Sequence, residues 1–114
     1  MDPRHQFGKI AERLAERHYH NLGFQLLAKN FRVKAGEIDL VLKKGGLLLF
    51  VEVKGRTKDW EQHAWSPSWG MKRKRLHSAI RAFLAVHREL NYSEARVEVA
   101  FVTQGRVEAV YEGI

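Results

Sequence analysis

The sequence predicts one domain of the mixed α/β (α+β) class, in which a central mixed five-stranded sheet is flanked by helices in the order α-β-β-β-α-β-β. Three observations lead to this fold. Two stretches repeat apolar residues with the 3.6-residue period of a helix, and shorter stretches alternate apolar and polar residues as strands do. Glycine-containing turns separate several of the strands. With 114 residues the chain can build one core but not two, so we expect residues 1–114 to form a single domain.

The first helix is expected over residues 7–22, followed by a less regular strand over residues 24–33. The apolar stripe of the helix consists of Ile10, Ala11, Leu14, Ala15, Tyr19 and Leu22. Gly23 supplies the stop signal. Asp2-Pro3 resembles an N-cap followed by a first-turn proline, which allows an earlier start.

A hairpin is expected over residues 36–54, because two alternating stretches flank the turn dipeptide Gly45-Gly46. This two-residue loop sets four cross-strand pairs: Lys44–Leu47, Val41–Phe50, Asp39–Glu52 and Glu37–Lys54. Period-2 alternation then predicts a core face formed by Ile38, Leu40, Leu42, Leu49, Val51 and Val53. The opposite face carries the charged residues Glu37, Asp39, Glu52 and Lys54, together with Val41 and Phe50.

The second half of the chain is expected to contain a long loop, a helix and two strands. Residues 55–70 read as a polar, aromatic-rich loop, and loops of this length are often functional. The helix is expected over residues 71–90, with a core stripe formed by Leu76, Ala79, Ile80, Phe83, Leu84, His87 and Leu90. Strands are expected over residues 96–103 and 107–111, joined by the turn Gln104-Gly105.

The composition excludes several classes of function. The chain has no cysteine, so it has no disulfide, no thiolate zinc site and no cysteine nucleophile. No apolar run approaches the length of a membrane span, and the amino terminus lacks the apolar stretch of a signal peptide. No nucleotide-binding fingerprint is present. We therefore expect an intracellular, cytoplasmic protein without a membrane partner or a nucleotide cofactor.

The net charge of +7 and the pI of about 10 favour a polyanionic partner, of which nucleic acid is the commonest. A basic domain can also simply be a soluble one, so charge alone leaves both interpretations open.

The paired carboxylates of the hairpin point to a metal site. Two carboxylates directly opposite each other on a sheet repel, and a divalent cation between them would remove that penalty. Asp39 and Glu52 are suitable ligands for a hard cation such as Mg²⁺ or Mn²⁺. Lys54 would reach the same place and could orient a water molecule or stabilise charge on a phosphate. The ordinary alternative is a Glu37–Lys54 ion pair beside a solvated Asp39 and Glu52.

Several motifs resemble those of the YraN family, predicted endonucleases of the PD-(D/E)xK superfamily that are similar to Holliday-junction resolvases. These segments are Gly8-x-x-Ala11-Glu12-x-x-Ala15, Gly23-Phe24, Asn30-Phe31-Arg32, Gly36-Glu37-Ile38-Asp39-Leu40-Val41, Phe50-Val51-Glu52-Val53-Lys54-x-Arg56 and Lys72-x-x-x-Leu76. The resemblance covers residues 8 to about 103 and implies a restriction-endonuclease-like fold. After the second helix the family usually shows an Arg-aromatic-Asp strand, whereas this chain has Arg96-Val97-Glu98.

The resemblance also implies roles for individual residues. Asp39 and Glu52 would be metal ligands, the Val53 backbone carbonyl a third ligand, and Lys54 the catalytic lysine. Glu12 matches an acidic residue that related nucleases bring to the metal site, although its ordinary interpretation is a surface helix glutamate. The role of Glu98 stays open.

Basic residues near these motifs are candidate phosphate contacts, and each could equally belong to a solvated surface. They are Arg32, Lys34, Arg56, Lys58, Lys72, Arg73, Lys74 and Arg75. Trp60, Trp65 and Trp69 in the long loop could stack on unpaired bases, but a role in the core edge or in a dimer contact ranks first.

We therefore expect a Mg²⁺- or Mn²⁺-dependent endonuclease that acts on branched or structured DNA, with a homodimer suited to two symmetric cuts. Two alternatives remain open at this point. One is a non-catalytic nucleic-acid-binding module of the same fold, and the other is a protein-interaction module that docks through the tryptophan loop and the basic helix.

Overall fold

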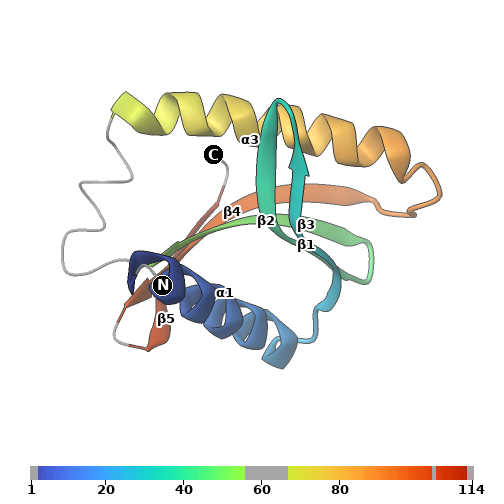
Figure 1. The fold of residues 1–114 in the computed structure, drawn as a ribbon. Helices are drawn as coiled ribbons and strands as arrows, with labels where there is room; N and C mark the ends of the chain where they lie inside the picture. The colour runs from blue at the N-terminus through green and yellow to red at the C-terminus, as the bar shows by residue number, and fades with distance from the viewer. Residues whose placement is uncertain (1–2, 56–66, 104, 113–114) are drawn as a thin grey trace.

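Five strands form one mixed sheet in the part of the chain that the computed structural model describes, residues 3–55, 67–103 and 105–112 (Figure 1). Across the sheet the strands keep their sequence order: β1 Gln25–Val33, β2 Gly36–Lys44, β3 Leu47–Gly55, β4 Glu94–Thr103 and β5 Arg106–Glu112. β3 and β4 run parallel, and the other neighbours run antiparallel. The connection from β3 to β4 contains a helix, as parallel neighbours require.

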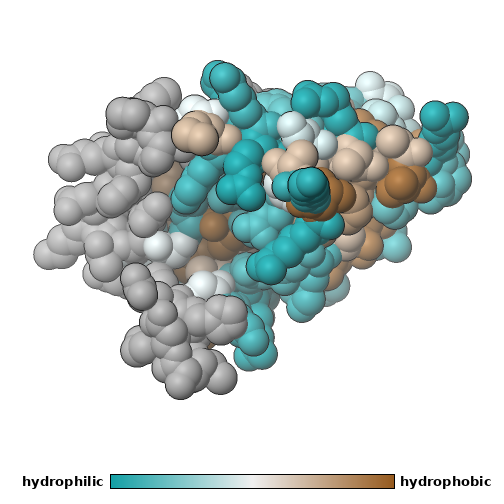
Figure 2. Space-filling view, turned by 45° about the horizontal axis from the view of Figure 1, so that its top comes forward, coloured by the Kyte–Doolittle hydropathy of each residue, from teal (hydrophilic) through white to brown (hydrophobic). Residues whose placement is uncertain are grey.

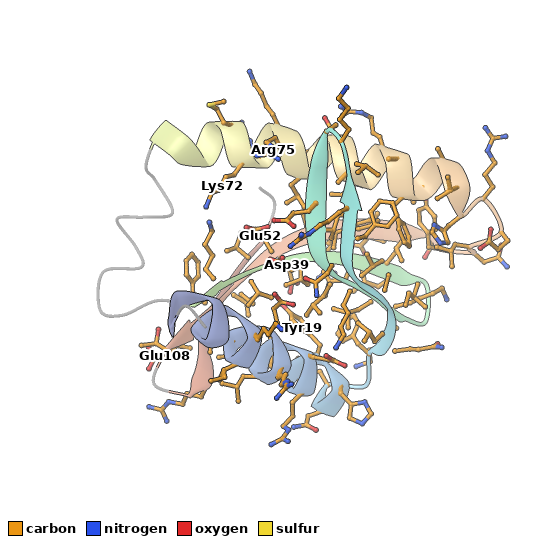
Figure 3. All side chains as sticks on the ribbon, viewed as in Figure 1. Tyr19, Asp39, Glu52, Lys72, Arg75 and Glu108 are labelled. Atoms are coloured by element: carbon orange, nitrogen blue, oxygen red, sulfur yellow. The ribbon has the colours of Figure 1, made fainter. Side chains whose placement is uncertain are left out.

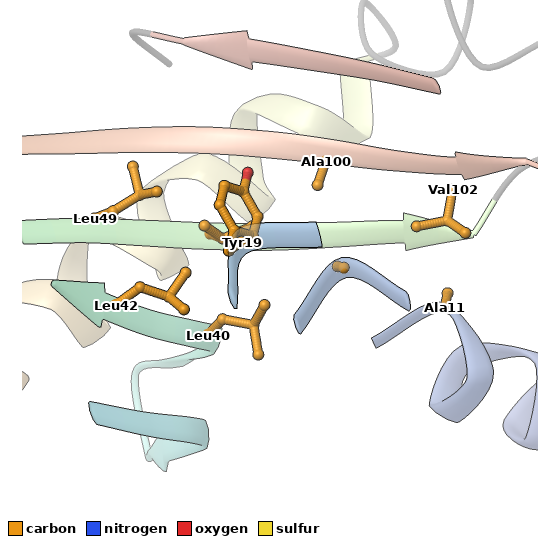
Figure 4. Close-up of a cluster of buried hydrophobic side chains, with 9 residues drawn as sticks. Ala11, Tyr19, Leu40, Leu42, Leu49, Ala100 and Val102 are labelled. Carbon is orange, nitrogen blue, oxygen red and sulfur yellow. The ribbon is translucent and has the colours of Figure 1, made fainter. Parts of the chain in front are cut away.

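Two helices, α1 (Pro3–Asn21) and α3 (Pro67–Val86), pack on opposite faces of the sheet (Figure 1). The layer beneath α1 contains Ala11, Ala15, Tyr19, Leu40, Leu42, Leu49, Val51, Ala100 and Val102, most of which Figure 4 labels. The layer beneath α3 contains Ile38, Val41, Leu48, Phe50, Leu76, Ala79, Ile80 and Phe83. Each helix therefore buries one apolar stripe, and the sheet is covered on both faces.

The predicted fold class and element order are confirmed, and the boundaries of α3 differ from the prediction. The helix begins at Pro67 and not at residue 71, because proline suits the first turn of a helix, where its missing N–H has no partner to lose. It ends at Val86, and His87 follows it with its ring stacked on Phe83 at 4.0 Å and Nδ1 2.9 Å from the Phe83 carbonyl. None of the helices in the described ranges is long and apolar enough to cross a membrane.

The prediction that Ile38 shares a face with Leu40 is wrong. Ile38 packs in the layer beneath α3, whereas Leu40 packs beneath α1. The alternation fails because β2 pairs with β3 only from Lys44 to Leu40; from there to Gly36 its paired partner is β1. Over this stretch the β1–β2 hairpin leaves the sheet and rises to α3 (Figure 1).

Gly36 permits this close approach of the hairpin to α3. A Cβ atom at position 36 would collide with the backbone carbonyl of Arg75, lying 2.6 Å from its carbon. Only a residue without a side chain fits between the two backbones. The hairpin tip and the helix are thus docked backbone to backbone.

Candidate metal centre

Asp39 lies where β2 separates from β3. The ladder between the two strands runs as predicted from Lys44–Leu47 to Leu40–Val51 and then stops, so Val53 has no backbone partner on β2. Instead, the Val53 backbone N–H donates a hydrogen bond of 2.7 Å to Oδ2 of Asp39. The carboxylate takes the place that a backbone carbonyl would occupy in a continuous hairpin. The sheet itself therefore fixes the position of Asp39.

The Val53 carbonyl points to the side of β3 from which β2 has separated. The N–H and C=O groups of one strand residue point to the same neighbouring strand. Since the Val53 N–H reaches Asp39, the Val53 carbonyl oxygen also points toward the side that β2 has left. This orientation agrees with the predicted role of that oxygen as a ligand beside Asp39.

Glu52 and Lys54 lie on the α3 side of β3, since Val51 and Val53, which alternate with them, pack toward α1. Nζ of Lys54 is 3.8 Å from Oε1 of Glu52. The two side chains are only 8% and 18% exposed, respectively. Ionisable groups buried to this extent need partners of opposite charge, and Lys54 and Glu52 provide this for each other.

The acids of this region perturb one another. Burial, together with the negative charges of Glu52, Glu12 and Glu37, raises the pKa of Asp39 to about 8, although the hydrogen bond from Val53 lowers it. Burial also raises the pKa of Glu52, an effect that the positive charges of Lys54 and Lys72 oppose. Such a concentration of carboxyl groups is favourable only with a bound proton or a bound cation.

Glu12 and Lys72 extend the site onto the two helices. Glu12 is half-buried on α1, and its charge acts on Asp39. Lys72 is exposed on α3, and its charge acts on Glu52. Figure 3 shows Lys72 extending from α3 toward the side of the sheet where Glu52 and Asp39 lie. The charges of Glu12 and Lys72 thus reach Asp39 and Glu52 from the two helices, while the predicted role of Glu12 at a metal stays a prediction.

The predicted pairing of Glu37 with Lys54 is wrong. Glu37 forms an ion pair with its neighbour on β1, Arg32, whose Nε lies 2.8 Å from Oε2 of Glu37. The pairing fails because β2 has already left β3 at this level. Glu37 still acts on Asp39 and Glu52 through its charge.

The predicted phosphate contacts divide into three groups. Lys34 is exposed in the turn between β1 and β2, and Arg32 beside it is held by Glu37. Lys72, Arg73, Lys74 and Arg75 are all exposed on α3. Arg56, Lys58, Trp60 and Trp65 lie outside the described residues, and of Trp69 only the backbone in the first turn of α3 is described.

Sequence reasoning missed a polar pair between α1 and β4. The Tyr19 hydroxyl donates a hydrogen bond of 2.9 Å to Oε1 of Glu98. Burial and the neighbouring charge of Glu98 raise the pKa of Tyr19. Tyr19 belongs to the predicted apolar stripe, and the parallel pairing of Glu98 with Val51 brings the acid beneath α1. In this chain Glu98 therefore anchors the first helix to the sheet.

Substitution of Tyr19 by phenylalanine is expected to lower the free energy of unfolding by about 1–3 kcal/mol, because the half-buried Glu98 carboxylate loses its hydrogen-bond donor. Urea denaturation measures the change. Tyr92→Phe is the matched control, since Tyr92 is 42% exposed and its hydroxyl is not part of this pair. Equal stability of the two variants would show that the Tyr19–Glu98 hydrogen bond does not anchor α1.

The donor set fits a hard divalent cation. Within the described ranges, no three His, Cys, Asp or Glu side chains come together as a metal site. The site instead offers the two carboxylates of Asp39 and Glu52 with the Val53 carbonyl. Mg²⁺ is commonly held by one or two carboxylates, with water and substrate phosphate completing its coordination. All three donors are oxygens, the ligand type that Mg²⁺ and Mn²⁺ prefer.

Comparison with known proteins places these residues in a family. The model described as "Uncharacterised protein family UPF0102" matches residues 11–102, a segment that contains Glu12, Asp39, Glu52 and Lys54. A UPF0102 protein of Gloeobacter violaceus is 43% identical over 103 residues, which cover 90% of this chain and 82% of the relative. A UPF0102 protein of Synechococcus sp. is 37% identical over 98 residues, covering 85% and 75%. A third, from Halorhodospira halophila, is 43% identical over 86 residues, covering 75% and 70%. The chain therefore belongs to the UPF0102 family, the YraN family that its motifs predicted.

Proposed function

We propose that this protein is a Mg²⁺- or Mn²⁺-dependent endonuclease that hydrolyses phosphodiester bonds in DNA. The observation that carries the proposal is the convergence of Asp39, Glu52, the Val53 carbonyl and Lys54 at the point where β2 leaves β3. Asp39 replaces a backbone partner of the sheet and lies beside the buried Glu52–Lys54 pair. The site is therefore rich in oxygen donors and has the ammonium group of Lys54 next to them. Such a donor set suits metal-assisted phosphate hydrolysis.

The residues of the site would divide the reaction among them. Asp39, Glu52 and the Val53 carbonyl would hold the metal ion, which when bound polarises the phosphate and lowers the pKa of a water molecule. Lys54, 3.8 Å from Glu52, would orient the attacking water or stabilise the negative charge that develops on the phosphate. The water oxygen would attack phosphorus in line with the 3′ oxygen and lose one proton to solvent, while the P–O3′ bond breaks and the leaving 3′ oxygen takes up one proton from solvent.

The substrate assignment rests on charge and on the family resemblance. The net charge of +7, the exposed cations Lys72–Arg75 of α3 and the action of the Lys72 charge on Glu52 favour a polyanion such as DNA. The resemblance to resolvase-like nucleases favours branched or structured DNA and a homodimer. The conclusion is an endonuclease with backbone-dominated contacts.

Incision of labelled linear and four-way-branched DNA in Mn²⁺ tests this function. Wild type is expected to cut at least one of these substrates, and Glu52→Gln to lose at least about 100-fold in rate, because even an outer partner of a metal ligand is worth 10–100-fold in activity. Glu89→Gln is the control, since Glu89 is an exposed acid beyond the end of α3. Equal cleavage by wild type and Glu52→Gln would contradict the role of this site.

A non-catalytic DNA-binding module is the second candidate, and the composition of α3 favours it: the helix has five Lys and Arg residues and no acid. It predicts that DNA binding depends on salt, is indifferent to Mn²⁺ and is unchanged by Glu52→Gln. Binding without incision on every substrate would select this candidate.

A further inference from the structure

The solvent-facing side of α3 carries only positive charge. Lys72, Arg73, Lys74, Arg75 and Arg81 belong to this helix, and no Asp or Glu occurs between Pro67 and Val86. Like charges three and four residues apart repel on a helix, and cations in the first turns also oppose the helix dipole. No residue of the helix offsets these costs, whereas a bound polyanion would.

Three of the basic and histidine side chains of α3 form a line of their own. Arg73, His77 and Arg81 recur every four residues, so they follow one flank of the helix. Together with Lys74 and Ser78 they line a hollow of about 590 Å³. An Arg81 guanidinium nitrogen donates a hydrogen bond of 3.1 Å to Oγ of Ser78, which fixes the arginine along this line. Figure 2, which brings α3 forward, shows mainly hydrophilic side chains across the middle of this face.

This line is turned away from the candidate metal centre. At about 100° per residue, Arg73, His77 and Arg81 lie roughly 100–180° around the helix axis from Lys72, whose charge acts on Glu52. Arg75 lies about 60° around the axis from Lys72, in the direction away from Arg73, and its backbone is the part of α3 that meets Gly36 of the β1–β2 hairpin. A DNA segment placed against Lys72 and the carboxylates would therefore not cover the line.

We propose that Arg73, Lys74, His77 and Arg81 form a second DNA-backbone surface, which takes a DNA segment other than the one at the metal centre. The inference rests on the proposed DNA-binding function. Arg73 and Arg81 are about 12 Å apart along the helix, a length over which one DNA strand carries three to four phosphates at about 3.4 Å each. The arginines and the lysine supply charge, and the half-buried His77 and Ser78 are placed to reach phosphate oxygens.

The test measures binding of a labelled DNA duplex by fluorescence anisotropy between about 50 and 200 mM KCl. The variant is Arg73→Gln/Arg81→Gln. The matched control is Arg13→Gln/Arg17→Gln, which removes the same charge from two exposed arginines four residues apart on α1. If each arginine contacts one phosphate, the negative slope of log K against log salt becomes shallower by about 1.8 in the α3 variant, while it stays close to wild type in the control. Mn²⁺ binding, measured by calorimetry, stays unchanged in both.

The outcomes separate the two proposals. An equal change of slope in both variants, or no change in the α3 variant, overturns the second surface and leaves the endonuclease proposal standing. If wild type binds no DNA at about 50 mM KCl, the endonuclease proposal and the second surface fail together.

Discussion

Substitution of Asp39 by asparagine is expected to weaken Mn²⁺ binding by at least about 100-fold, the upper end of what loss of a ligand's outer partner costs. The asparagine Oδ1 can still accept the hydrogen bond that the Val53 N–H donates at 2.7 Å to the aspartate, so the sheet contact is kept while the charge is lost. Calorimetric titration of Mn²⁺ measures the change. Asp39→Ala removes both the charge and the acceptor, so it should lose stability as well as metal binding.

The same substitution is expected to change how stability depends on pH in metal-free protein. The pKa of Asp39 is about 8 in the folded state against an ordinary value of 3.8, so between these values the folded state binds more protons than the unfolded state. The contribution of Asp39 to the free energy of unfolding is therefore fully present below about pH 4 and is lost as the pH rises through about 8. At about 1.4 kcal/mol per pKa unit the loss amounts to a few kcal/mol.

Asp39→Asn removes this titrating group, so the variant should unfold at higher urea concentration than wild type at about pH 9 in the presence of EDTA. Some pH dependence should remain, because burial also raises the pKa of Glu52. Added Mn²⁺ should stabilise wild type and leave the variant unchanged. A wild type with equal stability at about pH 5 and pH 9 without metal would refute the electrostatic account of Asp39.

Substitution of Gly36 by alanine is expected to destabilise the protein by about 1–3 kcal/mol and to weaken Mn²⁺ binding as well. The added Cβ would meet the backbone carbonyl of Arg75, and neither backbone can yield without moving the hairpin away from α3. Asp39 lies three residues along the same strand, so displacement of the hairpin also displaces the carboxylate. Urea denaturation and Mn²⁺ titration measure the two effects.

Gly70→Ala is the matched control for Gly36→Ala. Gly70 belongs to α3, and a Cβ there meets no atom within 4 Å. Alanine is favoured over glycine inside a helix, so this variant should be equal to wild type or more stable by about 0.5–1 kcal/mol. Equal behaviour of the two alanine variants would show that the contact between the hairpin and α3 does not position Asp39.

The sequence predicted the sheet well because its signals are local. Gly45-Gly46 fixes the loop length, and loop length fixes the register from Lys44–Leu47 to Leu40–Val51. The departure of β2 from β3 has no local signal, since alternation assumes a continuous ladder. For this reason Ile38 and the partner of Glu37 were wrongly assigned. The predicted cross-strand pair Asp39–Glu52 does not form either, because the ladder ends at Leu40–Val51, although the charge of Glu52 still acts on Asp39.

Contacts between elements distant in the chain were harder to predict. The hydrogen bond from Tyr19 to Glu98 joins residues 79 positions apart, and it needs both the parallel pairing of β3 with β4 and the packing of α1 on that face. Of the line Arg73, His77 and Arg81, only Arg73 was among the residues singled out from the sequence. The run Lys72–Arg75 indicates four adjacent basic residues, whereas a helix brings together residues four positions apart.

Asp39 has two possible reasons to be kept among relatives: its side chain replaces a backbone partner of the sheet, and its carboxylate is a candidate metal ligand. A relative that abandoned chemistry would still need an acceptor for the Val53 N–H, so aspartate or asparagine there reports on folding. The side chains of Glu52 and Lys54 replace no backbone partner of the sheet, and replacing such a buried charged pair with apolar residues is often neutral or stabilising. Under the proposed endonuclease function, relatives that have lost the activity should therefore diverge first at positions 52 and 54, and these two positions, more than 39, would distinguish catalytic members of the family from non-catalytic ones.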